Sequence, residues 1–312
     1  MGQLENGKWV YENTLGSGPC HNVLGSAEFP FDEKTPKGRY HLYLATSCPF
    51  AHRTHIALFL AKLDSQIDVH FTYHVKTPEG WGFETHGNPT VGDGLSHHKL
   101  LSDVYLDADP NYTGRVTVPL LIDSQPTSSE GGTGKTRIVS NESLEIVNFF
   151  AKLSQNKAFG LDQKVNSEVS ELVDTFYGFV GKSSNSKTQE EYDENSEKVF
   201  DALQRFDNIL AKQKFLAGDH PGVPDAVVFP FFSRFDIVFA ILFKLTKKRF
   251  SDYKNLDIYF RRLYQLPRIK ETVAIDEIKS ALFTKSYLEH HTLNPDIIPT
   301  TPELDWDVPV DE

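Results

Sequence analysis

The hydrophobic period of the chain changes twice within its first regular stretch, and this limits the folds that it can adopt. Residues 39–46 alternate in the manner of a strand. From Pro49 to Leu63 the large apolar residues recur at helical spacing, and the proline stands in the first turn, where it is tolerated. Residues 67–75 alternate again. A strand, a helix and a strand in such close succession predict a parallel strand pair, because the helix must return the chain across the sheet.

Two more strands and a helix are predicted after a long connection. Residues 77–115, rich in Gly, His and Asp, predict a long and partly ordered excursion. A strand over 116–123 follows, then a flexible hairpin insert over 124–135 and a second strand over 137–140. A helix over 142–153 ends this part of the chain. The order of strand–helix–strand, connection, strand–strand–helix is that of a thioredoxin-like α/β domain. We assign this domain to residues 39–153.

The second half of the chain shows helical periodicity only. Residues 165–290 predict an all-helical domain, in which the block 229–245 is apolar nearly all round and is expected to be one core helix. Residues 1–38 are punctuated by glycine and proline and predict an irregular N-terminal extension. Residues 291–312, rich in proline and acidic side chains, predict a solvated tail. The expected fold class is therefore α/β plus all-α.

The composition narrows the function classes. The chain has 312 residues, 39% of them hydrophobic, which favours two domains with a proper core. Its two cysteines and an N-terminus unlike a signal peptide favour a reducing, cytoplasmic location. No apolar run approaches the roughly 20 residues needed to cross a bilayer. The net charge of −11 makes nucleic acid and anionic membranes poor partners, although a helix N-terminus can still bind a small anion.

One cysteine stands at the junction between the first predicted strand and helix. Cys48 directly precedes Pro49, so its thiol lies at a helix N-terminus, where unpaired N–H groups and the macrodipole stabilise an anion. The thiolate is the nucleophilic form of a cysteine. The other cysteine, Cys20, lies far upstream, so Cys48 is expected to act as a lone thiol and to need an external thiol, such as glutathione, to resolve a mixed disulfide. The structural alternative is a small buried cysteine without chemistry.

Several ordered segments resemble one known family. Cys48-Pro-Phe-Ala-His-Arg53 resembles the Cys-Pro-Trp-Ala-His-Arg segment of the glutathionyl-hydroquinone reductases, the Xi class of glutathione transferases. Further matching segments follow in the same order: Gly80-Trp81, Asp109–Pro119, Val139–Ser143, Arg234–Asp236, Tyr253–Leu256, Leu263–Pro267 and Asn294-Pro295. The resemblance implies a thioredoxin-like domain, an all-helical C-terminal domain and a homodimer. It also implies a glutathione-dependent thiol transferase.

The resemblance and the local chemistry together suggest a glutathione site. The expected contacts are a tryptophan, an arginine, a Val-Pro element and a Glu-Ser helix start: Trp81, Arg115, Val118, Pro119, Glu142 and Ser143. The Val-Pro element resembles the one that presents backbone groups to the cysteinyl part of the tripeptide, as an added strand would. The hydroxyl of Ser143 and free N–H groups can take the γ-glutamyl carboxylate, while Glu142 takes the ammonium. The structural alternatives are helix capping by the Glu-Ser pair and packing by the tryptophan.

Two departures from the family pattern concern the acceptor pocket. In the family a tyrosine follows the Phe-Asp-x-Val segment and a second comes from an early C-terminal helix, and both hydroxyls lie near the cysteine. Here the first position is Phe239, and the second aligns with residues 179–181, so that Tyr177 is the nearest hydroxyl. A milder change, which keeps an aromatic ring, is Phe50 in place of the tryptophan of the Cys-Pro-Trp segment. We expect Phe50, Tyr177 and Phe239 to line the acceptor pocket.

Three functions are compatible with these residues. The first is an enzyme that removes glutathione from conjugates, glutathionyl-hydroquinones foremost, through a Cys48 mixed disulfide. The second, favoured by the missing tyrosines, is an omega-like transferase that reduces small disulfides or dehydroascorbate. The third is a non-catalytic protein of the same fold that holds hydrophobic ligands, with the block 229–245 lining the pocket. The histidines show no metal-ligand spacing, so no metal is expected.

Overall fold

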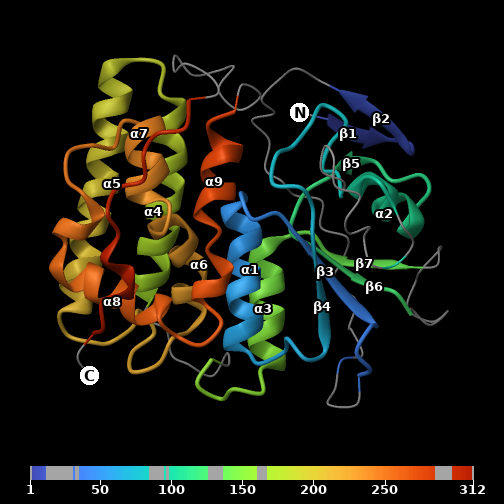
Figure 1. Ribbon diagram of the computed structural model, residues 1–312, viewed down its shortest axis with the longest axis horizontal. Coiled ribbons are helices and arrows are strands. Elements are labelled where there is room, and N and C mark those ends of the chain that lie inside the picture. Colours follow the sequence, from blue (N-terminus) through green and yellow to red (C-terminus); the bar gives the residue numbers. More distant parts are fainter. Residues whose placement is uncertain are drawn as a thin grey trace.

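The computed structural model combines a mixed-sheet domain with a helical domain (Figure 1). It describes residues 2–11, 31, 35–83, 95, 98–125, 136–159, 167–284 and 297–310. Figure 1 shows the sheet on one side of the molecule, the helical bundle on the other and helices α1 and α3 between them. Helix α1 packs against both α3 and α6, so the two domains share this contact layer. The expected fold class is confirmed.

The main sheet has the strand order β4-β3-β6-β7. Its strands are β3 (Tyr40–Leu44), β4 (Ile67–Phe71), β6 (Leu120–Asp123) and β7 (Arg137–Ser140). Strands β3 and β4 pair in parallel, as the strand–helix–strand pattern predicts, with α1 (Pro49–Leu60) as the crossover. Strand β6 pairs antiparallel with both β3 and β7. Helix α3 (Ser143–Leu153) follows β7 and completes the thioredoxin-like order.

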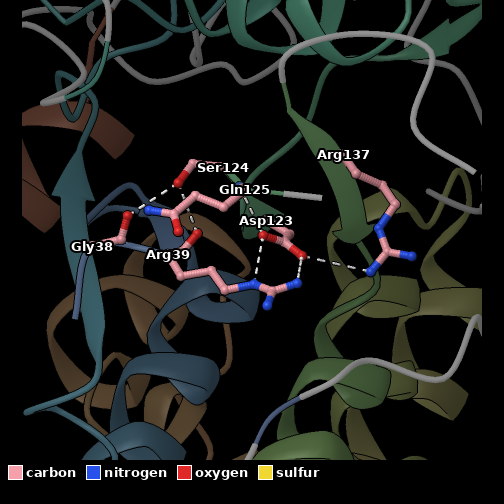
Figure 2. Close-up of polar contacts among 6 residues, drawn as sticks. All are labelled: Gly38, Arg39, Asp123, Ser124, Gln125 and Arg137. Carbon is pink, nitrogen blue, oxygen red and sulfur yellow. Dashed lines mark hydrogen bonds and ion pairs between the residues drawn. The ribbon is translucent and has the colours of Figure 1, made fainter. Parts of the chain in front are cut away.

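A buried carboxylate joins three strands of this sheet at one end (Figure 2). Asp123 is fully buried, and its two oxygens accept hydrogen bonds from Nε and Nη2 of Arg39 at 3.0 and 2.7 Å. Nη2 of Arg137 lies 3.7 Å from the same carboxylate. Beside it, the hydroxyl of Ser124 donates to the carbonyls of Gly38 and Arg39 at 3.0 Å. Two cations thus share one buried anion, and the ends of β3, β6 and β7 are fixed together.

The prediction of an irregular backbone up to residue 38 is wrong for residues 2–11. Strands β1 (Gly2–Glu5) and β2 (Lys8–Tyr11) form a hairpin, and β1 also pairs with β5 (Gly114–Arg115). The turn is Asn6-Gly7, with φ of 48° and 76°, which is the tight hairpin turn that this dipeptide favours. A Cβ atom on Gly7 would lie 2.2 Å from the carbonyl oxygen of Pro110, so only glycine fits there.

The excursion over residues 77–115 contains a helix that was not predicted. Helix α2 (Leu101–Ala108) buries Leu101, Val104 and Tyr105 at helical spacing. The carboxylate of Asp103 accepts a hydrogen bond from the N–H of Leu100 at 3.1 Å and so caps the helix start. Residues 84–94, 96 and 97 lie outside the described part, as do residues 126–135 of the expected hairpin insert.

The C-terminal half is helical, as predicted. Its larger helices are α4 (Ser167–Asn185), α5 (Gln189–Leu210), α6 (Val223–Phe232), α8 (Lys254–Tyr264) and α9 (Ile275–Leu282). The shorter turns are η2 (Phe235–Phe239), α7 (Ala240–Leu242), η3 (Phe250–Asp252) and η4 (Lys270–Thr272). No helix of the described residues is both long and apolar enough to span a membrane.

The prediction of one core helix over residues 229–245 is wrong. Helix α6 ends at Phe232, and a π-helical turn, η2, follows after Ser233 and Arg234. The cause is the pair of charged residues inside the apolar block. The side chain of Arg234 donates to the carbonyl of Pro230, which would accept the N–H of residue 234 in a regular helix, and that N–H bonds to the carbonyl of Phe231 instead. Asp236 accepts from the N–H of Phe250, a residue outside this helix.

The C-terminal segment is not wholly solvated, which corrects the expected tail for residues 297–310. Its short turn η5 (Asp305–Asp307) places the ring of Trp306 4.9 Å from Phe260 and 5.4 Å from Tyr264 of α8. Nε2 of Gln265 donates to the carbonyl of Trp306 at 2.8 Å. The aromatic side chain in an otherwise polar segment is the signal for this docking.

Candidate functional site

Cys48 lies at the N-cap of α1, where the sequence placed it. Its backbone is extended, with φ −83° and ψ 116°, and its carbonyl accepts the first helical hydrogen bond from the N–H of His52 at 3.0 Å. The partly buried thiol donates to the carbonyl of Val118 at 3.7 Å. The Val118–Pro119 peptide bond is cis. The predicted nucleophile and the predicted Val-Pro element are therefore adjacent.

The two residues before Cys48 hold its loop to distant elements. The hydroxyl of Ser47 donates to the carbonyl of His74, beyond β4, at 2.6 Å. The hydroxyl of Thr46 donates to a carboxylate oxygen of Glu277 on α9 at 2.6 Å. Both domains thus contribute contacts that fix the position of the thiol.

A buried arginine lies five residues beyond Cys48, on α1. Arg53 is 1% exposed, and its guanidinium carbon lies 4.7, 5.4 and 5.8 Å from the ring centres of Phe50, Tyr177 and Phe231. These are cation–π distances. Its Nε and Nη2 make no hydrogen bond within the described residues. Burial lowers the pKa of Arg53 to about 10, and the charges of Tyr177 and Cys48 act in the opposite direction.

The structure brings the three predicted acceptor-pocket residues together around one further ring. Phe231 of α6 lies 5.8 Å from both Phe50 and Tyr177, and 6.2 Å from Phe239. Phe50 is 41% exposed, whereas Tyr177 is half-buried. The sequence did not single out Phe231, because an all-apolar block does not show which face meets a pocket. We call these four rings the aromatic cluster.

The predicted γ-glutamyl contacts lie at the start of α3. Glu142 is the N-cap residue, and the buried Ser143 is the first residue of the helix. The N–H of Glu142 donates to the hydroxyl of Ser140 at 3.0 Å. The charge of Glu142 acts on the pKa of both Arg53 and Tyr177, so the start of α3 lies near the aromatic cluster.

Trp81 and Arg115 are positioned by other neighbours. Trp81 follows Gly80, which has a φ of +111°, and its carbonyl accepts from the N–H of Leu101 at 2.8 Å. Arg115 pairs with Gln3 in the hairpin sheet. Their role in binding glutathione stays a prediction. In the part of the chain that the structure describes, no three His, Cys, Asp or Glu side chains gather as a metal site would require.

Comparisons with known proteins identify the family. Models of the glutathione S-transferase N-terminal and C-terminal domains match residues 47–153 and 170–267. The glutathionyl-hydroquinone reductase YqjG of Escherichia coli is 37% identical over 99% of this chain and 92% of its own length. The chain belongs to the glutathionyl-hydroquinone reductase family, the Xi class of glutathione transferases.

Two solved structures and one further relative agree with this assignment. The glutathione-bound structure of YqjG superimposes with a TM-score of 0.78 at 34% identity, covering 99% of this chain and 98% of that chain. An Xi-class transferase from Natrialba magadii gives a TM-score of 0.81 at 29% identity, covering 99% of this chain and 95% of its own. The omega-like glutathione S-transferase 2 of Schizosaccharomyces pombe is 34% identical, over 83% of each chain. The predicted family, fold and enzyme class are confirmed.

Proposed function

We propose that the protein removes glutathione from conjugates by forming a mixed disulfide between Cys48 and glutathione, with glutathionyl-hydroquinones as the first substrates. The observation that supports this most directly is the lone thiol at the N-cap of α1, next to the Val118–Pro119 element and close to the aromatic cluster. The family membership supports the same substrate class, since YqjG is a glutathionyl-hydroquinone reductase.

In the first step, the Cys48 thiolate attacks the sulfur of the conjugate. An S–S bond forms between Cys48 and glutathione, and the bond between that sulfur and the ring carbon breaks. The electron pair of the broken bond goes to the ring carbon, which takes up a proton and leaves as the hydroquinone. The substrate carbon is thereby reduced, and Cys48 and the glutathionyl sulfur are oxidised to a disulfide.

In the second step, a glutathione thiolate attacks the glutathionyl sulfur of the mixed disulfide. Glutathione disulfide leaves, and Cys48 is released as a thiolate. The sum of both steps converts one conjugate and one glutathione into hydroquinone and glutathione disulfide. The second thiol must come from solution, because the mechanism uses Cys48 as its only protein thiol.

For glutathione itself we propose three contact regions. Val118 and Pro119 present backbone groups to its cysteinyl part beside Cys48. Glu142 and Ser143 take its γ-glutamyl end at the start of α3, where the free N–H groups of the first turn favour a carboxylate. The third region consists of the side chains of Trp81 and Arg115, which the family resemblance suggests.

The acceptor ring is proposed to lie against the aromatic cluster. Tyr177 supplies a hydroxyl there, and burial raises its pKa above the ordinary 10, so the group stays protonated at neutral pH and can donate a hydrogen bond. Phe239 supplies a ring surface without a donor. The aromatic cluster therefore suits a small hydrophobic acceptor.

The deciding experiment uses glutathionyl-menadione that is kept in its reduced, hydroquinone form, and follows its glutathione-dependent conversion to menadiol by chromatography. Turnover that requires Cys48 supports the proposed function. A folded protein that binds glutathione without this turnover contradicts it, and rates with small disulfides and dehydroascorbate then test the omega-like alternative, which the phenylalanine at position 239 favours. Activity with none of these acceptors favours the ligand-binding alternative. A homodimer and a cytoplasmic location stay predictions.

A tyrosine at position 239, as in the family pattern, is expected to raise the rate at which the hydroquinone is formed. Phe239→Tyr adds a donor next to Phe231 of the aromatic cluster, and one hydrogen bond made only in the transition state is worth about 1 kcal/mol, or roughly fivefold in kcat. The matched control is Phe243→Tyr, because Phe243 stacks on Phe239 at 5.1 Å and is not one of the four rings of the aromatic cluster. Equal rates for wild type and both variants would contradict the placement of the acceptor.

A further inference from the structure

We propose that Arg234 positions Cys48 and is the buried counter-charge of its thiolate, an inference that rests on the proposed nucleophilic role of Cys48. Arg234 lies between α6 and η2, in the helical domain, and is fully buried. It is therefore a residue of one domain that acts on the reactive group of the other.

The guanidinium of Arg234 contacts the chain on both sides of Cys48. Its Nη2 donates to the carbonyl of Thr46, two residues before the cysteine, at 2.7 Å. Its Nη1 lies 3.1 Å from Nδ1 of the His52 ring, and the backbone N–H of His52 donates to the carbonyl of Cys48. Nη1 also donates to the carbonyl of Pro230 at 2.8 Å, which anchors the side chain to α6. One rigid, planar group thus sets the distance between the loop before Cys48 and the first turn of α1.

The contact with His52 has a defined polarity. An arginine can only donate, so Nδ1 of His52 accepts, and the proton of the neutral ring lies on Nε2. That nitrogen is 2.7 Å from the hydroxyl of Thr272, which itself donates to the carbonyl of Ile269 at 2.7 Å. Burial, and next the charge of Arg234, lower the pKa of His52 well below 6.5, so the ring is neutral at physiological pH. A neutral His52 leaves the charge of Arg234 uncompensated.

The described residues provide no carboxylate for Arg234. Its bonds go to two carbonyls, a neutral imidazole and the hydroxyl of Ser233, and its Nε has no partner. This contrasts with Arg39, which is paired with the buried carboxylate of Asp123. A buried cation without an anion is costly. Burial lowers the pKa of Arg234 to about 10, and the charge that opposes this shift is that of Cys48. The thiolate is therefore the anion that this site lacks.

Other charged groups near the thiol do not replace Arg234. On α1 itself, Arg53 is a second cation but is also influenced by Glu142, Asp174 and Tyr177. From other elements that the structure describes, the loop contacts two titratable residues: Glu277 of α9, through its carboxylate, and His74, beyond β4. The negative charges of these carboxylates disfavour a thiolate at Cys48. The positive charges of Arg53 and Arg234 must therefore have the larger effect on it.

The test measures the pH dependence of Cys48 alkylation by iodoacetamide in the full-length protein, with the Cys48 peptide quantified by mass spectrometry so that Cys20 does not contribute. Arg234→Gln removes the charge and still offers N–H donors, now from a side-chain amide. We expect the midpoint of the reactivity profile to move up by about one pH unit, with alkylation at pH 7 roughly tenfold slower. The matched control is Arg137→Met, another buried arginine whose loss affects the sheet end but leaves the profile of Cys48 unchanged.

Arg234→Lys separates charge from position. It keeps the cation but loses the planar fork, so the alkylation midpoint is expected to stay near that of the wild type while kcat for glutathionyl-menadione falls by about tenfold. If the glutamine variant does not fold, an upward shift of the midpoint in the lysine variant contradicts the proposal. An unchanged profile in Arg234→Gln also contradicts it. Wild-type turnover that needs Cys48, together with such an unchanged profile, would leave the proposed function standing and reject the role of Arg234 alone.

Discussion

Cys48→Ala is expected to lower kcat/KM for glutathionyl-menadione by about 10³-fold or more, because the variant lacks the thiol on which the mixed disulfide of both proposed steps forms. Alanine also removes the weak hydrogen bond to the carbonyl of Val118 but leaves the N-cap backbone unchanged. The thermal stability and the binding of glutathione should therefore change little. The measurement is a set of steady-state rates by chromatography, with glutathione in excess.

Two control variants make this result specific. Cys48→Ser keeps the size of the side chain and should be as inactive as the alanine variant, because an alcohol is far less ionised than a thiol at neutral pH. Cys20→Ala should keep the wild-type rate. Activity within tenfold of the wild type in Cys48→Ala would reject the proposed mechanism and favour a reaction in which glutathione alone acts as the nucleophile.

Asp123→Asn is expected to lower the free energy of unfolding by about 3 to 5 kcal/mol, the usual cost of removing one partner of a buried ion pair. Asparagine has the same shape as aspartate, so the loss is one of charge. The carboxylate is fully buried, and it offsets the cations of Arg39 and Arg137 at the ends of three strands. The measurement is urea unfolding followed by circular dichroism, with the midpoint compared at equal slope.

The matched control for this prediction is Glu197→Gln. Glu197 accepts from Lys247 at 2.6 Å, which is as short as the contact between Asp123 and Arg39. The side chains of Glu197 and Lys247, however, are both more than half exposed. Water screens such a pair, so the expected loss is below about 1 kcal/mol. An equal loss of unfolding free energy in the two variants would show that burial does not determine the strength of the contacts of Asp123 with Arg39 and Arg137.

Local patterns were sufficient for the elements whose signal is short-range. The switch of period around α1 predicted the parallel pair of β3 and β4, and the Cys-Pro junction predicted the N-cap. The N-terminal hairpin was missed although its signal, Asn6-Gly7, is present, because the surrounding glycines and prolines suggested irregular structure. The break after α6 was missed because an apolar block hides the effect of single charged residues.

The parts of the site that sequence reasoning did not reach depend on long-range contacts. Arg234 and Thr46 are 188 residues apart in sequence, and nothing near either residue indicates that they share a hydrogen bond. Phe231 likewise joins the aromatic cluster only because α6 packs against α1 and α4. Sequence patterns can name a reactive residue by its local setting, whereas its positioning and its charge environment are set by how the helical domain packs on α1.

The central claim, a mixed disulfide between Cys48 and glutathione, is tested most directly by mass spectrometry. The reduced protein is mixed with glutathionyl-menadione in its hydroquinone form, without free glutathione, quenched with acid and digested without reductant. We predict one glutathionyl group on the Cys48 peptide, an equal amount of menadiol, and loss of the adduct when glutathione is added. Release of menadiol only on adding glutathione, with Cys48 unmodified throughout, would contradict the account.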